Sequence, residues 1–373
     1  MKIISDPTRD TRTAKPDPGS YEWWYFDALS ESGEFGLVVI FYEGNPFSSR
    51  YRDSMSTLAW ETPEPARSFP ALSISIYRHG RPVYYGFQEV EPEDADFQTD
   101  EIRGHVGRSS FQAIQAENRP EYRVILDQAL VNGDRISGEL TFQSELPPLA
   151  EFPGPGRAGP ESERSLTGSP DGTGHLWNLV QPCASVSGDL ELTGFKPLSV
   201  RFSGIGYHDH NLGREPMERS FLDWYWGRFH LPGRTFVYYV MNLLNGGRQH
   251  CSWMVDQRGR VTPAGTEVTL SDKETSLFGL QSARKLTFTG DGVRATVQQE
   301  KVLDNGPFYQ RFLSSVLAED GEQVFGGKGV SEYIMPGRIH MPIFRPLVNM
   351  RIAYPGKKGH WVQKSPRLYR WTW

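Results

Sequence analysis

Three short stretches of this sequence combine titratable side chains with aromatic rings, and they are the first places to look for chemistry. Carboxyl, imidazole, phenol and indole groups held close together can transfer protons and stabilise charge. The stretches are Tyr21-Glu-Trp-Trp-Tyr-Phe-Asp27, His175-Leu-Trp177, and Tyr207-His-Asp-His-Asn211 with its continuation Trp224-Tyr-Trp226.

If the second and third stretches form β-strands, the alternation of side chains assigns each residue to a face. Residues two positions apart then share a face, and their immediate neighbours point the opposite way. The predicted groups are His175 with Trp177, then Tyr207 with Asp209 and Asn211, and on the other side His208 with His210.

Asp209 is the candidate proton donor. A carboxyl group among aromatic rings in an apolar cavity has its charged form disfavoured, so it can stay protonated and serve as an acid. The ring faces of Trp177 and Tyr207 would stabilise a carbocation or an ammonium ion. The structural alternative is that Asp209 and Asn211 bond to a turn while the two rings are ordinary core.

His208 and His210 allow a second interpretation, a zinc site. They stand at i and i+2 of one strand, and His175 or His230 could supply a third ligand. A single His-x-His lacks the fixed third ligand that makes such a signature specific. Solvated or hydrogen-bonded histidines are the favoured interpretation, and no metal or other cofactor is predicted.

Composition and missing motifs exclude several other classes. A formal net charge of −5 argues against a nucleic-acid partner. No Gly-x-Ser-x-Gly, Gly-x-x-x-x-Gly-Lys-Ser/Thr or His-Glu-x-x-His is present, which disfavours serine-hydrolase, nucleotide and zincin chemistry. Two cysteines, Cys183 and Cys251, cannot build a disulfide framework, and whether they pair is left open.

Short strands are the elements that must position these residues. Residues 71–77 alternate Leu72, Ile74 and Ile76 with small or hydroxyl side chains, and a second strand at 82–90 follows the turn Arg78-His-Gly-Arg81. No stretch has a strong helical period of ten residues or more. Many short strands separated by Gly and Asn turns predict an all-β fold of barrels or sandwiches.

Two interruptions suggest how the chain is organised. Residues 144–174 are rich in proline and glycine and show no periodicity, so they are predicted to be a long loop leading to His175. A second break, at 213–216, predicts an N-terminal domain of residues 1–215 with the proposed catalytic residues and a C-terminal domain of residues 216–373.

Targeting signals are not evident. Residues 1–10 have no apolar core of a signal peptide, and the longest apolar stretches fall far short of the roughly 18 residues that span a bilayer. The prediction is a cytoplasmic protein in a reducing compartment that at most lies on a membrane surface.

Several motifs in one order resemble the carotenoid 1,2-hydratase family. The similarity extends from about residue 20 to residue 335, and the series is far more specific than any single motif. The motifs are Tyr21-Glu-Trp-Trp-Tyr-Phe-Asp27, Gly44-Asn-Pro-Phe-Ser48 with Tyr51, His175-Leu-Trp177 with Gln181-Pro-Cys183, Gly206-Tyr-His-Asp-His-Asn-Leu-Gly213, Phe221-Leu-Asp-Trp-Tyr-Trp-Gly-Arg228, and Asn305-Gly-Pro-Phe-Tyr-Gln-Arg311.

This resemblance implies two lipocalin-like β-barrel or sandwich domains. It also implies a hydro-lyase that adds water to the terminal double bond of an acyclic or monocyclic carotenoid, giving a tertiary alcohol without a cofactor. The implied catalytic residues are His175, Trp177, Tyr207 and Asp209, and the predicted substrate-binding rings are Trp24, Tyr25, Trp224 and Trp226.

A polyene substrate dissolved in bilayers would require peripheral membrane contact. By analogy with aromatic belts, Trp23, Trp24 or the end of the chain, residues 369–373, are candidate anchors, although all of them could equally pack in the core. Two further activities remain open, a polyene isomerase or pericyclase and a non-catalytic lipid carrier. Sequence alone does not determine the oligomeric state.

Overall fold

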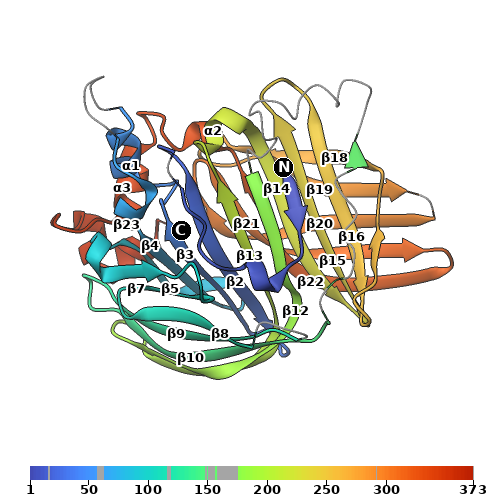
Figure 1. Ribbon diagram of the computed structural model, residues 1–373, viewed down its shortest axis with the longest axis horizontal. Coiled ribbons are helices and arrows are strands. Elements are labelled where there is room, and N and C mark those ends of the chain that lie inside the picture. Colours follow the sequence, from blue (N-terminus) through green and yellow to red (C-terminus); the bar gives the residue numbers. More distant parts are fainter. Residues whose placement is uncertain are drawn as a thin grey trace. The chain divides into compact units, whose positions relative to one another are not determined.

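The computed structural model describes residues 1–15, 17–56, 63–115, 119–147, 149, 156–157, 175–290 and 292–372, and strands dominate these residues (Figure 1). The strands are β1 (Lys2–Ile4), β2 (Tyr21–Ser30), β3 (Phe35–Glu43), β4 (Ala71–Arg78), β5 (Arg81–Glu89), β6 (Ala95–Phe97), β7 (Arg103–Val106), β8 (Ser109–Gln115), β9 (Glu121–Ala129), β10 (Arg135–Ser144), β11 (Gly156–Arg157), β12 (His175–Thr193), β13 (Leu198–Gly213), β14 (Phe221–Leu231), β15 (Arg234–Leu243), β16 (Arg248–Asp256), β17 (Val261–Pro263), β18 (Glu267–Thr275), β19 (Gln281–Gly290), β20 (Val293–Asn305), β21 (Tyr309–Asp320), β22 (Gln323–Ile334) and β23 (Ile352–Ala353).

Helices are few and short, as the absence of a long helical period predicts. The longest described α-helix has seven residues, and no described helix has the length and hydropathy to cross a bilayer. The α-helices are α1 (Ser49–Ser54), α2 (Met217–Ser220), α3 (Arg345–Arg351) and α4 (Pro366–Arg370), and the 3₁₀ helices are η1 (Pro7–Arg9), η2 (Ala66–Ser68), η3 (Pro92–Asp94), η4 (Pro336–Arg338) and η5 (Trp361–Lys364).

By its internal contacts the chain groups into two compact units. The first unit contains Ile4–Pro148, His175–Pro216 and His340–Trp373, and the second contains Met1–Ile3, Leu149–Gly174 and Met217–Ile339. The predicted domains, 1–215 and 216–373, remain a prediction. Residues 340–373 fall in the first unit because β23 pairs in parallel with β5 there.

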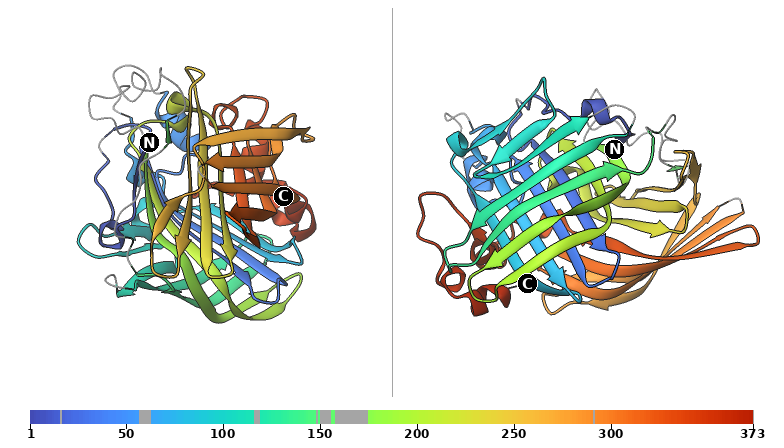
Figure 2. Two further views of the ribbon diagram at one scale, coloured as in Figure 1. Left: turned by 90° about the vertical axis from the view of Figure 1, so that its right-hand side faces the viewer. Right: turned by 90° about the horizontal axis from the view of Figure 1, so that it is seen from below.

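The sheet of the first unit runs in the order β23-β5-β4-β3-β2-β13-β12-β10-β9-β8-β7-β6. Figure 2 shows its strands curling around one side, which makes the lipocalin-like half-barrel that the sequence predicts. The interior is a single apolar cluster, to which β2 contributes Trp24, Phe26 and Ala28. The even-numbered side chains of β2 therefore face the barrel interior.

The hairpin of β4 and β5 shows how local sequence sets this sheet. His79 and Gly80 form its two-residue turn with φ of 49° and 65°, the backbone that a tight hairpin of this twist requires. Ile74 and Ile76 enter the apolar cluster as their alternation predicts. Local pattern and tertiary structure agree here.

The longest strands described, β12 and β13, pair with each other along their length. β13 also pairs with β2, so that it lies between the strand with His175 and Trp177 and the strand with Tyr25. Trp177 is opposite Asn211, and Asp209 is opposite Tyr25 on the other side. This three-strand pairing is the frame of the candidate site.

The second unit has its own sheet, in the order β11-β16-β15-β14-β22-β21-β20-β19-β18, with β17 paired to β16. A separate apolar cluster fills it, including Phe229, Phe236 and Phe288. Within the predicted loop at 144–174, Gly156 and Arg157 form β11 against β16, and most of the remaining loop lies outside the described residues.

Candidate active site

The four predicted catalytic residues converge on one carboxyl group. Trp177 on β12 and Tyr207 on β13 both donate to Oδ2 of Asp209, from Nε1 at 2.7 Å and from Oη at 2.6 Å. His175 reaches the same carboxyl group through Asn211. The shared face predicted from strand alternation is thus confirmed.

Asp209 is held by three donated hydrogen bonds, because Asn211 Nδ2 also donates to its Oδ1 at 2.8 Å. The residue is only 4% exposed. Burial favours the neutral acid, whereas hydrogen bonds donated to the carboxylate favour the ionised form. The three donors fix the orientation of the carboxyl group within the site.

His175 is buried between two polar partners. Its Nδ1 lies 3.0 Å from Tyr21 Oη and its Nε2 lies 3.2 Å from Asn211 Oδ1. Burial lowers the pKa of His175 to about 3, so the imidazole is neutral near pH 7. The chain Tyr21, His175, Asn211 and Asp209 is continuous and made of neutral donors and acceptors plus one carboxyl group.

This chain has two self-consistent hydrogen-bond arrangements. In one, His175 donates to the Asn211 carbonyl, and the Asn211 amide donates to the Asp209 carboxylate. In the other, the Asn211 side chain is reversed, accepts from a protonated Asp209 and donates to the imidazole, which then donates to Tyr21. Amide and tautomer orientation are assignments, so the distances admit both.

Aromatic rings border the same face. Tyr25, a predicted substrate-binding residue, packs edge-on to Tyr207 with centroids 6.2 Å apart. Trp23 stacks on Tyr21 at 5.1 Å and lies 5.9 Å from His175. Ring faces of this number beside a carboxyl group suit an unsaturated, apolar ligand and a positive charge formed within it.

Trp24 does not lie with these rings. It is on the barrel side of β2, where its indole N–H donates to the backbone carbonyl of Asp10 and its ring stacks on Phe97 and His210. Its contact with substrate stays a prediction. The other two predicted rings, Trp224 and Trp226, are buried on β14 of the second unit.

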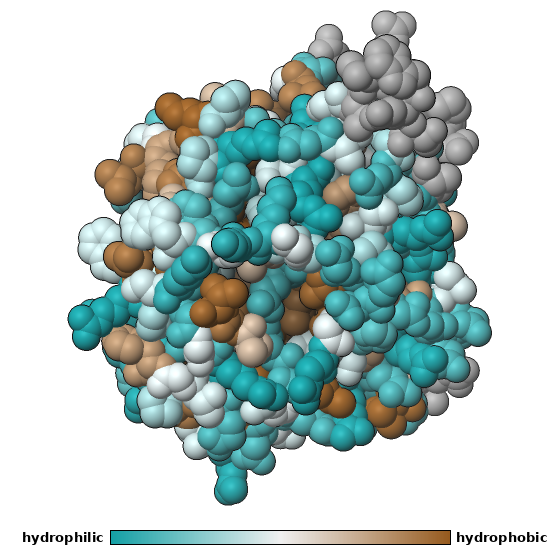
Figure 3. Space-filling model, turned by 90° about the vertical axis from the view of Figure 1, so that its left-hand side faces the viewer, coloured by the Kyte–Doolittle hydropathy of each residue, from teal (hydrophilic) through white to brown (hydrophobic). Residues whose placement is uncertain are grey.

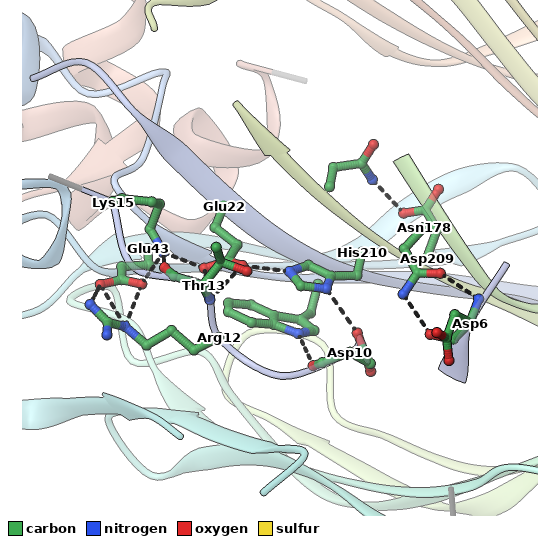
Figure 4. A network of polar contacts seen from close by, with 12 residues as sticks. Asp6, Asp10, Arg12, Thr13, Lys15, Glu22, Glu43, Asn178, Asp209 and His210 are labelled. Atoms are coloured by element: carbon green, nitrogen blue, oxygen red, sulfur yellow. Dashed lines mark hydrogen bonds and ion pairs between the residues drawn. The ribbon is translucent and has the colours of Figure 1, made fainter. Parts of the chain in front are cut away.

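His208 and His210 also face the barrel, where they hold the N-terminal segment. Figure 4 shows His210 between Asp10 and Glu22. His208 Nε2 lies 2.9 Å from Asp10 Oδ2, and His210 bridges Asp10 and Glu22 at 3.2 and 2.8 Å. Among the described residues, no group of three or more His, Cys, Asp or Glu side chains is arranged to hold a metal ion. Both cysteines are thiols.

Charge pairing sets the protonation states of this second cluster. Burial alone would raise the pKa of Asp10, but His208 and His210 lower it to about 2. Burial alone would lower the pKa of His210, but Asp10 and Glu22 raise it to about 9. Lys15 extends the network by pairing with both Glu22 and Glu43.

Sequence reasoning did not select Tyr21 or assign a role to Asn211. Tyr21 is in the first aromatic stretch, and Asn211 shares the parity of Asp209, but only the pairing of β2 with β13 and of β13 with β12 places both beside His175. The signal was present as residue type and spacing. The order of the strands in the sheet was needed to use it.

A cavity elsewhere is chemically different. About 450 Å³ of space opens within the second unit, lined by Asp223, Arg248 and Lys273 together with Tyr225 and Tyr333. Burial raises the pKa of Asp223 above its ordinary value. Walls with three charged groups do not suit an apolar polyene, and no predicted site residue contributes to them.

Several known proteins have sequences related to this chain. A hydroxyneurosporene dehydrogenase of Chlorobaculum tepidum is 30% identical over 96% of this chain and 94% of its own length. An acyclic carotenoid 1,2-hydratase of Thiocapsa roseopersicina is 28% identical over 83% of this chain and 68% of its own length.

The fold is shared with more distant solved structures. The crystal structure of CghA superposes with a TM-score of 0.57 at 13% identity, covering 89% of this chain and 96% of that one. The sequence profile described as "Carotenoid hydratase CrtC" matches residues 147–362, a stretch that includes all four of the converging residues. The chain therefore belongs to the CrtC carotenoid hydratase family.

Proposed function

We propose that this protein is a cofactor-independent hydratase that adds water across the terminal double bond of an acyclic or monocyclic carotenoid. The observation that carries the proposal is the Asp209 carboxyl group, with Trp177 and Tyr207 hydrogen-bonded to one of its oxygens. These bonds hold two electron-rich rings beside the carboxyl group that must deliver the proton. The relatives named as carotenoid hydratases support the same substrate class.

In the first step, neutral Asp209 gives its proton to the less substituted alkene carbon. The π electrons form the new C–H bond, and the positive charge develops on the more substituted carbon. Trp177 and Tyr207 stabilise this charge through their ring faces. Because both rings are already fixed by their bonds to Asp209, they need no reorganisation when the charge appears.

In the second step, water attacks the carbocation and forms the C–O bond of a tertiary alcohol. Because both ring nitrogens of His175 are engaged with Tyr21 and Asn211, neutral His175 orients this water through Asn211 and the Asp209 carboxylate. A histidine whose pKa is lowered to about 3 does not keep a proton near neutral pH, so the proton that water loses returns to the Asp209 carboxylate. The acid is regenerated and the net change is the addition of one water.

Asn211 couples the two halves of this cycle. The arrangement in which it accepts from Asp209 matches the neutral acid before protonation, and the arrangement in which it donates matches the carboxylate afterwards. Tyr21 accommodates either tautomer of His175, because a hydroxyl both donates and accepts. Both residues act by positioning the groups that react.

We further propose that the protein works in the cytoplasm on a membrane surface. Its substrate class dissolves in the hydrocarbon of the bilayer, so the enzyme must collect it there. Peripheral contact is consistent with a chain whose described helices do not span a bilayer.

The test is incubation of the purified, EDTA-dialysed protein with a lycopene-type carotenoid in D₂O, followed by mass spectrometry. The expected product is one or two waters heavier, with deuterium on the carbon next to each new C–OH. A product of unchanged mass would indicate an isomerase or pericyclase, and recovery of unaltered, bound substrate would indicate a carrier. Either result overturns the hydratase proposal.

A further inference from the structure

The C-terminal segment, residues 341–373, differs in charge from the rest of the chain. It contains seven of the 40 Lys and Arg residues and none of the 45 Asp and Glu residues, in a protein with a net charge of −5. A basic segment on an otherwise acidic protein is an electrostatic contact for an anionic partner.

This segment is also unusually apolar at its surface. Trp371 is 88% exposed, Ile343 72% and Trp361 65%, and Met341 and Leu368 are exposed as well. No other tryptophan is among the exposed large apolar side chains of the described residues. Figure 3, which views the side where α1, α3 and β23 lie, shows apolar and pale side chains along its left edge among hydrophilic ones.

The exposed rings are fixed to the first unit. Tyr369, which is buried, donates to the backbone carbonyl of Arg351 at 2.7 Å, and buried Gln363 donates to the carbonyl of Ile352 at 2.9 Å. Ile352 in turn pairs with β5. The segment thus buries Val362 and Tyr369 against the first unit and leaves Trp361 and Trp371 exposed.

The same segment carries exposed cationic side chains. Lys357, Lys358, Lys364 and Arg367 are exposed, and none forms an ion pair with any residue in the described part of the chain. Arg345, by contrast, is paired with Asp53. Arg367 lies over the ring of Phe195, itself 39% exposed, which joins that ring to the same surface.

We propose that this surface, which we call the C-terminal anchor, docks the protein on a membrane containing anionic lipids. Tryptophans enter the headgroup region, aliphatic side chains reach the acyl boundary, and the lysines bind lipid phosphates. A nucleic acid would satisfy the cations but leave Ile343, Met341 and Leu368 in water. The inference extends the proposed function by naming the surface through which the enzyme meets its substrate.

Vesicle co-sedimentation of the full chain tests the anchor. Wild-type protein should bind vesicles of phosphatidylcholine mixed with phosphatidylglycerol, more weakly at high salt, and bind pure phosphatidylcholine poorly. Trp361→Ser/Trp371→Ser should lose at least about tenfold in partitioning to the mixed vesicles, since it removes the interfacial rings. Lys357→Gln/Lys358→Gln should lose most of the dependence on phosphatidylglycerol.

Matched controls come from the second unit. Leu277→Ser and Arg258→Gln/Arg260→Gln alter equally exposed side chains outside the anchor and should bind like wild type. The proposal is overturned if the wild type ignores both kinds of vesicle, if the double tryptophan variant binds normally, or if a DNA duplex binds the anchor as tightly as the vesicles.

The vesicle result is independent of turnover. With a detergent-solubilised carotenoid, Trp361→Ser/Trp371→Ser should hydrate at the wild-type rate, because the anchor is not part of the Asp209 site. Wild-type protein that binds the vesicles but does not hydrate the carotenoid would count against the proposed function alone. Wild-type protein that hydrates the carotenoid in detergent but does not bind the vesicles would count against the anchor alone.

Discussion

The two faces of β13 carry similar residue types in opposite electrostatic settings. On one face Asp209 is bound by an indole, a phenol and an amide. The pKa of His175, which is linked to Asp209 through Asn211, is lowered to about 3. On the other face Asp10 is bound by two imidazoles and by the Tyr122 hydroxyl, and the pKa of His210 is raised to about 9. Asp209 thus accepts hydrogen bonds from uncharged donors on one face of β13, whereas Asp10, on the other face, has the charged His210 among its partners.

The comparison separates a reactive site from a structural one. Asp10 surrounded by imidazoles stays ionised and ties the N-terminal segment to the sheet, so it has no proton to give. The hydrogen bonds described for Asp209 come from uncharged donors, and the proposed mechanism uses this carboxyl group as the proton donor. Partners, rather than burial alone, distinguish the two, since both carboxyl groups are almost completely inaccessible to solvent.

The largest expected effect is on activity. Asp209→Asn removes the proposed acid but keeps the shape of the side chain, so turnover should fall by about 100- to 10,000-fold or more while the fold is retained. Product formation measures the turnover, and circular dichroism shows whether the fold is retained. Asp189→Asn, an exposed residue of β12, is the control and should keep full activity. Near-normal hydration by Asp209→Asn would refute its assignment as the acid.

On the barrel face the corresponding change should affect stability instead. Asp10→Ala leaves His208 and the positively charged His210 without their shared carboxylate, which should cost about 3–5 kcal/mol in the free energy of unfolding. Urea denaturation provides the measurement. Asp189→Asn breaks only an exposed pair with Arg201 and should change that free energy by less than about 1 kcal/mol. Equal effects of the two variants would contradict the structural role of Asp10.

The pH dependence of stability should differ between the two histidines. The pKa of His210 is raised in the folded protein, so its contribution is complete below pH 6.5 and is lost as the pH rises through about 9. The pKa of His175 is lowered, so its contribution is complete above pH 6.5 and is lost as the pH falls through about 3.

Unfolding free energies measured from pH 4 to pH 9.5 test this. His210→Gln should remove the decline on the alkaline side, worth on the order of 2–3 kcal/mol, and His175→Gln should weaken the decline on the acid side. Protonation of Asp10 lowers the free energy of unfolding only below the measured range, because the pKa of Asp10 is about 2. A wild-type profile that is flat between pH 6.5 and 9 would contradict the charged state of His210.

The smallest expected effect comes from the positioning residues. Tyr21→Phe removes one hydrogen bond to His175 and should lower kcat by about tenfold or less, with KM little changed. The ¹⁵N chemical shifts of His175 would report the altered tautomer without any need for turnover. Unchanged shifts together with unchanged kcat would show that Tyr21 has no positioning role.

Much of the fold was predictable because it is local. Alternation in Ala71–Arg78 and the turn at His79 and Gly80 reflect rules that operate within a few residues, and both were predicted. The same period-two rule placed Tyr207 and Asp209 on one face, which the hydrogen bond between them confirms. By the same rule Trp24, at an even position on β2, faces the barrel, on the opposite side of the strand from Tyr25.

The sequence by itself determined the residue types, their alternation along each strand and the series of motifs that identifies the family. Only the tertiary structure decided which strands are neighbours, because strand pairing joins residues far apart in the chain and depends on how the whole sheet closes. It thereby brought Tyr21 and Asn211 to His175, and Asp10 to His208 and His210. Whether a buried carboxyl group reacts or stabilises depends on such partners, and no local pattern specifies them.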